Sequence, residues 1–173
     1  GLMTAETLSQ GGIQVDLYDA MPSVGRKFLL AGVGGMNITH SEPFNAFLSR
    51  YGASSESIRP MLEGFPSDAL RAWVHGLGIE TFVGSSGRVF PTDMKAAPLL
   101  RAWLHRLREA GVQFHMRHRW LGWNDDGAQR IAAESGIAEA DMTILPSAVD
   151  LRRFATVRDP APSPVRAALF GNQ

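Results

Sequence analysis

Residues 25–39 read GRKFLLAGVGGMNIT, a glycine-rich stretch that also carries a basic pair. Its glycines are Gly25, Gly32, Gly34 and Gly35. Such glycines let the main chain take positive φ angles and lie close to a flat ring or a pyrophosphate. Arg26 and Lys27 offer positive charge to phosphate oxygens, while Asn37 and Thr39 offer polar groups to a ring or a ribose. The stretch predicts an ordered nucleotide-binding loop; the alternative is a flexible surface loop with a solvated basic pair.

The residues before this loop follow the order of a dinucleotide-binding unit. We expect a helix over residues 1–10 and a strand at 13–18 that ends in Asp19. In such units an acid roughly 20 residues after the glycine-rich turn holds a ribose hydroxyl. Asp19 lies 18 residues after Gly1, which places Gly1 at the last glycine of a G-x-G-x-x-G turn. The strand and the two glycines expected before Gly1 are missing.

The rest of the chain predicts an α/β fold with a helical region inserted around residues 41–92. Within that region Ser67 is expected to cap a helix at 68–75, and short strands are expected at 79–83 and 88–90. The expected elements after it are a helix at 94–110, a strand at 112–116, a hairpin at 120–132 and a short strand at 141–145. The pattern is that of a partial Rossmann-like domain with its first strand missing.

Composition and charge limit the possible classes of protein. With 173 residues, the chain is long enough for one domain of ordinary size. Lys plus Arg and Asp plus Glu each number 17, and this zero net charge argues against dependence on bulk attraction to phosphate. The absence of cysteine excludes thiol catalysis and Cys-ligated metal within the chain and fits a reducing compartment. No apolar run reaches the roughly 18 residues of a membrane span, so we expect a cytoplasmic protein without membrane contact.

The sequence resembles the YhiN/BaiN-like family of FAD-dependent oxidoreductases in two motifs, which occur in the same order as in that family. The first is the 25–39 stretch, with its Gly-Arg-Lys start and its later Asn and Thr. The second is Gly-Arg-Val-Phe-Pro at 87–91, followed by Lys-Ala at 95–96. The resemblance runs from Gly1 to about Leu145. It implies a glutathione-reductase-type FAD domain over 1–145.

The resemblance also implies roles for particular residues. Asp19 would bind the adenosine ribose, Arg26 and Lys27 would lie along the FAD, and residues 32–39 would approach the flavin. The strand at Trp120 would give main-chain contact to the adenine. The expected cofactor-binding residues are Gly1, Asp19, Gly25, Arg26, Lys27, Gly32, Gly34, Gly35, Asn37, Thr39 and Trp120. The flavin would hold the redox chemistry, so we assign no catalytic side chain and no metal. NAD(P)H is the expected electron donor, and the substrate is an unidentified small molecule.

The chain departs from the family pattern at three places. Met36 stands where many relatives have cysteine, and the first strand is absent. Relatives continue the last strand into Ala-Leu-Gly-Gly-Gly-Ser, whereas this chain reads PSAVDL from Pro146, a change that one deleted base would produce. We therefore expect an N-terminal fragment with a frameshifted, unstructured tail over 146–173. Alone it should bind FAD poorly, lack activity, and leave a sheet edge open to aggregation.

Two alternatives remain from the sequence. Arg and His residues crowd 101–119 beside Trp103 and Trp120, as in a non-enzymatic module that contacts nucleic acid. An amphipathic helix that uses Arg on its polar face explains the same pattern. A dehydrogenase that uses only NAD is a further possibility.

His115 and His118 should point to opposite faces of one strand, which argues against a shared metal.

Overall fold

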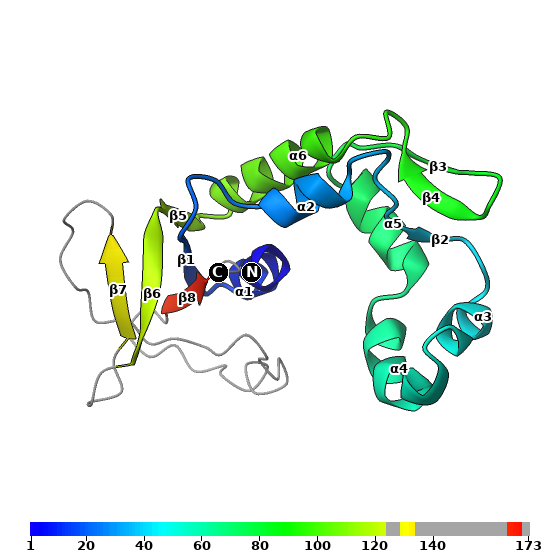
Figure 1. Cartoon of the computed structure of the whole chain (residues 1–173), viewed down its shortest axis with the longest axis horizontal. Helices are drawn as coiled ribbons and strands as arrows, with labels where there is room; N and C mark the ends of the chain where they lie inside the picture. The colour runs from blue at the N-terminus through cyan, green and yellow to red at the C-terminus, as the bar shows by residue number, and fades with distance from the viewer. Residues whose placement is uncertain (124–128, 134–165, 171–173) are drawn as a thin grey trace. The chain divides into compact units, whose positions relative to one another are not determined.

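The computed structural model describes residues 1–123, 129–133 and 166–170 (Figure 1). The chain forms two compact units, which are described separately. Unit 1 combines 1–25 with the described residues from 105 onward, and unit 2 is 26–104. Unit 2 thus contains the glycine-rich loop as well as the region around 41–92. In the described part of the chain, no helix has the length and apolar character needed to cross a bilayer.

A parallel sheet forms the centre of unit 1. Strand β1 (Gln14–Asp19) lies between β5 (Gln113–Met116) and β8 (Arg166–Phe170), and it runs parallel to both (Figure 1). Helix α1 (Leu2–Gln10) packs against β1. The apolar core of this unit includes Ala5, Leu8, Val15, Leu17, Leu107 and Val112. A buried parallel strand with a packed helix is the pattern of a Rossmann-type domain and confirms the predicted α/β fold class.

Strand β8 differs from expectation. We expected residues 146–173 to be unstructured and one edge of the sheet to stay open, but β8 pairs along β1 over its whole five-residue length. The sequence of β8, RAALF, is mostly apolar, and an unpaired strand edge offers N–H and C=O groups to any extended segment. The other residues of this tail and the predicted strand at 141–145 lie outside the described residues.

The predicted hairpin of unit 1 is confirmed. Strands β6 (His118–Trp123) and β7 (Gln129–Ala133) pair antiparallel, and the turn between them lies outside the described residues. The register shifts between Trp120 and Gly122, and Gly122 has a φ of 109°. This irregularity is a β-bulge, and glycine suits it because the conformation is left-handed.

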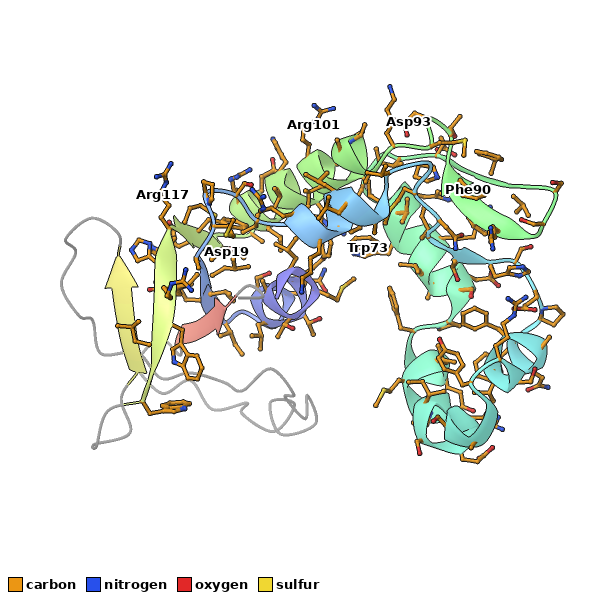
Figure 2. The ribbon with its side chains drawn as sticks, viewed as in Figure 1. Asp19, Trp73, Phe90, Asp93, Arg101 and Arg117 are labelled. Atoms are coloured by element: carbon orange, nitrogen blue, oxygen red, sulfur yellow. The ribbon has the colours of Figure 1, made fainter. Side chains whose placement is uncertain are left out.

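Unit 2 is mainly helical with one small antiparallel sheet, ordered β2-β4-β3. Its elements are α2 (Arg26–Ala31), β2 (Thr39–His40), α3 (Phe44–Ser49), the 3₁₀ helix η1 (Gly52–Ser54), α4 (Ser55–Gly64), α5 (Ser67–His75), β3 (Thr81–Val83), β4 (Arg88–Pro91) and α6 (Ala96–Glu109), whose last turn belongs to unit 1. Trp103 of α6 packs edge-on against Phe28 of α2 and Trp73 of α5, with ring centroids 6.2 and 4.9 Å apart (Figure 2 labels Trp73). These three aromatic side chains therefore pack together within unit 2, with Trp103 buried.

Two local predictions need correction. Helix α6 begins at Ala96 rather than at Met94, because Met94 has a φ of 58° and Asp93 Oδ1 accepts a hydrogen bond from Lys95 N at 3.0 Å. Ser67 does not cap α5, whose cap position is Pro66. At residues 93–95 a local side-chain hydrogen bond competes with the expected helix start, whereas the Ser67 hydroxyl bonds the distant Thr39 hydroxyl instead of capping α5.

Candidate functional site

Two motifs that are far apart in sequence meet in unit 2. Ile38 N donates a hydrogen bond to Val89 O at 2.8 Å, where β2 pairs with β4. Earlier in the loop, Met36 N donates to Met94 O at 2.9 Å. The later part of the glycine-rich loop is therefore joined main chain to main chain to residues 87–96, which favours the ordered-loop prediction.

The glycines of this loop serve different purposes. A Cβ on Gly32 would lie 2.4 Å from the Cβ of Ala96, so Gly32 permits close packing on α6. A Cβ on Gly35, at φ 123°, would meet Met94 Cε at 2.9 Å. At Gly34, with φ 88°, no atom of the described residues lies within 4 Å of that position. Gly34 is the place where the main chain is both left-handed and open to a flat group.

The polar side chains of the loop are engaged inside the protein. In the amide orientation that satisfies its neighbours, the Asn37 nitrogen donates to Thr39 O at 2.9 Å and to Val89 O at 3.3 Å. The Thr39 hydroxyl is buried and shares a 2.8 Å hydrogen bond with the Ser67 hydroxyl. These two predicted contact residues therefore brace the loop, and Ser67 joins them from α5.

The basic pair of the first motif is exposed. Arg26 and Lys27 form the start of α2. Within the described residues, no carboxylate lies within ion-pair distance of either side chain. Both charges are therefore available to an anion from solvent.

The other predicted site residues belong to unit 1 or its boundary. Asp19 ends β1 and is 8% exposed, and its Oδ1 accepts a hydrogen bond from Met21 N at 2.9 Å (Figure 2). Its carboxylate can still accept bonds on the other oxygen. Gly1 precedes α1, its carbonyl accepts from Ala5 N at 2.9 Å, and partial burial lowers the pKa of its amino group. Gly25 has a φ of 75°. Trp120 lies on β6 with its ring 6.4 Å from that of Trp123.

Unit 2 also contains a cavity of about 500 Å³ that sequence reasoning missed. The glycine-rich loop and β4 form one side, and helices α3, α4 and α5 form the rest. Its lining residues are Asn37, Ile38, Thr39, His40, Phe47, Arg50, Tyr51, Leu62, Phe65, Pro66, Ser67, Leu70 and Arg88. Arg88 belongs to the second motif and could have been noted there; the helical residues carry no signal that separates cavity lining from core.

One wall of the cavity depends on Gly87. A Cβ on Gly87 would lie 2.6 Å from Cε1 of His40, so only glycine lets this ring pack there. His40 Nε2 lies 2.9 Å from Ser86 O, and its Nδ1 accepts from Glu42 N at 3.2 Å. Glu42 in turn holds Arg50, with oxygen–nitrogen distances of 2.5 and 2.9 Å.

The prediction for the two histidines of unit 1 was wrong. Arg117 has a φ of 61° and turns the chain between β5 and β6, so the rings of His115 and His118 lie 5.8 Å apart (Figure 2 labels Arg117). Tyr18 stacks on His115 at 4.5 Å, and Asp16 Oδ1 lies 2.7 Å from His115 Nε2. Even so, the described residues contain no group of three side chains able to hold a metal ion.

Two arginines and one tryptophan of the basic stretch at 101–119 make contacts within the protein. Arg106 forms a 2.6 Å ion pair with Glu6, and the Arg108 guanidinium lies 5.1 Å from the Phe114 ring centre. Trp103 is 7% exposed and cannot stack on a base. These contacts favour the amphipathic-helix interpretation over a nucleic-acid surface.

Comparison with known families decides the assignment. The family model of the HI0933-like protein Rossmann domain matches residues 1–148. The chain belongs to this family. It is the YhiN/BaiN-like flavoprotein family, which consists of FAD-binding oxidoreductases. No curated protein matches the chain.

The residues of this HI0933-like chain fit an FAD. Gly34 offers open, left-handed main chain to a flat ring, and Arg26 and Lys27 offer uncompensated charge to phosphates. Asp19, at the carboxyl end of β1, has the position and chemistry of a ribose-binding acid. Each observation concerns one unit by itself.

Proposed function

We propose that the chain binds FAD and serves an oxidoreductase that takes electrons from NAD(P)H and passes them to a small-molecule substrate. The observation that carries the proposal is the loop of residues 32–39, fixed by main-chain hydrogen bonds with Gly34 left open. Rigid main chain with room beside it suits a flat ring because little ordering is needed on binding. Family membership supports the same cofactor.

Different residues would bind different parts of the FAD. Arg26 and Lys27 would neutralise the pyrophosphate, and Asp19 would accept hydrogen bonds from the adenosine ribose. Because the Asn37 and Thr39 side chains already hold partners, the loop would contact the ring mainly through its main chain. Main-chain contacts near Gly1, Gly25 and Trp120 are proposed for the adenosine end.

When bound, FAD supplies the two-electron chemistry, so no side chain of this protein needs to act as a nucleophile. The protein's part is to hold the ring, to neutralise phosphate charge and to shape the space beside the ring. We place the protein in the cytoplasm in this proposal, because NAD(P)H would be supplied there.

The first prediction tests flavin binding. The whole chain, which alone should bind FAD only weakly, should still quench flavin fluorescence when it is titrated with FAD. Gly34→Ala should weaken this binding by about tenfold or more, equivalent to at least ~1.4 kcal/mol. A Cβ at Gly34 would occupy the space for the ring and also strain a left-handed residue.

Gly78→Ala is the matched control. Gly78 also belongs to unit 2, has a φ of 76° and would have no described atom within 4 Å of an added Cβ. Both variants therefore carry the same backbone strain, and only Gly34→Ala should lose FAD affinity. Equal affinities of the two variants, or an unquenched flavin signal with the parent chain, would argue against the proposal.

A further inference from the structure

The cavity of unit 2 has properties that flavin binding does not explain. Its volume of about 500 Å³ is within the range of small-molecule sites, roughly 300–1,000 Å³. It opens beside the glycine-rich loop but extends to helices α3, α4 and α5. Its lining combines two arginines and one histidine with aromatic side chains.

The charge of the cavity is positive and comes from Arg88. None of the residues that line it is acidic. Arg50 is paired with Glu42 through two short contacts, and His40 Nδ1 lies 3.6 Å from the same carboxylate. Arg88 is exposed, and in the described chain no carboxylate lies within ion-pair distance of it. One uncompensated guanidinium selects an anion, and its planar shape suits a carboxylate.

The aromatic part of the lining is partly open to solvent. Phe65 and Tyr51 are 42% and 40% exposed, which is high for side chains of this size. Phe47 meets Tyr51 edge-on, with ring centres 6.0 Å apart, and Leu62 lies beside them in the cavity. Exposed aromatic rings that line a concave site gain free energy when a flat apolar group covers them.

We propose that this cavity binds an aromatic carboxylate of one or two rings. The carboxylate pairs with Arg88, and the ring lies against Phe65, Tyr51 and Phe47. That the cavity binds such a ligand does not depend on the proposed function. That the ligand is the substrate of the oxidoreductase rests on it. The charge favours a carboxylate over a neutral aromatic ligand, and the aromatic side chains favour an aromatic anion over a small inorganic one.

The second prediction uses 2-naphthoate and its neutral isostere 2-naphthalenemethanol as probes of the flavin-free whole chain. Ligand-observed NMR should show saturable binding of 2-naphthoate, about tenfold or more stronger than that of the alcohol. Arg88→Gln should remove this preference and leave binding of the alcohol unchanged, while Arg88→Lys should restore part of it. Phe65→Ala should weaken both ligands, because the ring wall serves both.

Arg101→Gln is the matched control. Arg101 lies in unit 2, is exposed on α6 (Figure 2) and does not line the cavity, so its loss changes the net charge equally. It should leave naphthoate affinity unchanged. Equal effects of Arg88→Gln and Arg101→Gln, or no saturable binding of naphthoate, overturn the proposal. Naphthoate binding without FAD binding would support the cavity assignment and overturn the flavin proposal. FAD binding without naphthoate binding would overturn only the cavity assignment.

Discussion

At the scale of single residues, glycines that look equivalent in the sequence have separate physical causes. Position 32 requires glycine because the Cβ of Ala96 lies too close to the position that a side chain there would occupy. Position 87 requires glycine because the His40 ring lies there in the same way. Gly34 alone of these three has open space. The sequence identified the loop but could not separate these roles, because each depends on a neighbour distant in the chain.

The third prediction follows from Gly32. Gly32→Ala should lower the free energy of unfolding of unit 2 by about 1–3 kcal/mol, since two Cβ atoms cannot share a 2.4 Å gap. Adding Ala96→Gly should recover part of that loss. Urea denaturation followed by tryptophan fluorescence measures the change.

Gly64→Ala serves as the control, because a Cβ there meets no described atom within 4 Å and its φ is not positive. It should be neutral or slightly stabilising, since alanine reduces the entropy of the unfolded chain. If Gly32→Ala is as mild as this control, the packing argument for Gly32 fails.

At the scale of elements, local signals predicted helices α1, α5 and α6 and the hairpin, but not the pairing of β8 with β1. Glycine stops and apolar periodicity fixed α5 and α6 to within about two residues, within the usual uncertainty of helix ends. The sequence predicted His115 and His118 on opposite faces of one strand, and this was wrong because Arg117 takes a left-handed conformation that is not expected of a residue other than glycine. Strand β8 was missed because nothing local marks which edge an apolar segment will join.

The fourth prediction tests β8. Removing residues 166–173 should leave one edge of β1 unpaired and speed hydrogen exchange of β1 amides by about tenfold or more, while amides of β4 in unit 2 stay protected. Removing only 171–173 is the control, because β8 remains. Unchanged exchange in β1 after the longer deletion would show that β8 contributes nothing to the sheet.

At the scale of the whole molecule, the candidate site residues are shared between the two units. The glycine-rich loop, the basic pair and the cavity lie in unit 2, while Asp19 and Trp120 lie in unit 1. Sequence reasoning placed these residues in one cofactor site, but it missed the cavity because that is built by the packing of three helices. Composition did not predict the division into two units, because both units have the composition of an ordinary globular protein.

The fifth prediction separates the units. A chain of residues 26–110, which keeps all of α6, should fold and retain naphthoate binding, because the cavity lies wholly within 26–104. Its FAD affinity should fall by about tenfold or more, because Asp19 is absent. Dispersed amide resonances check the folding, and the two titrations check the ligands. Full FAD affinity in 26–110 would remove Asp19 from the proposed site.

The pairing of β8 with β1 has a consequence for biosynthesis. A ribosome that adds about 5–20 residues per second would release β8 roughly 8–30 s after β1, so the sheet cannot close while most of the nascent chain is being made. Unit 2, which is continuous in sequence, is complete well before then. During that delay the edge of β1 that β8 later covers is open to pairing with other extended segments, and slower translation lengthens this exposure.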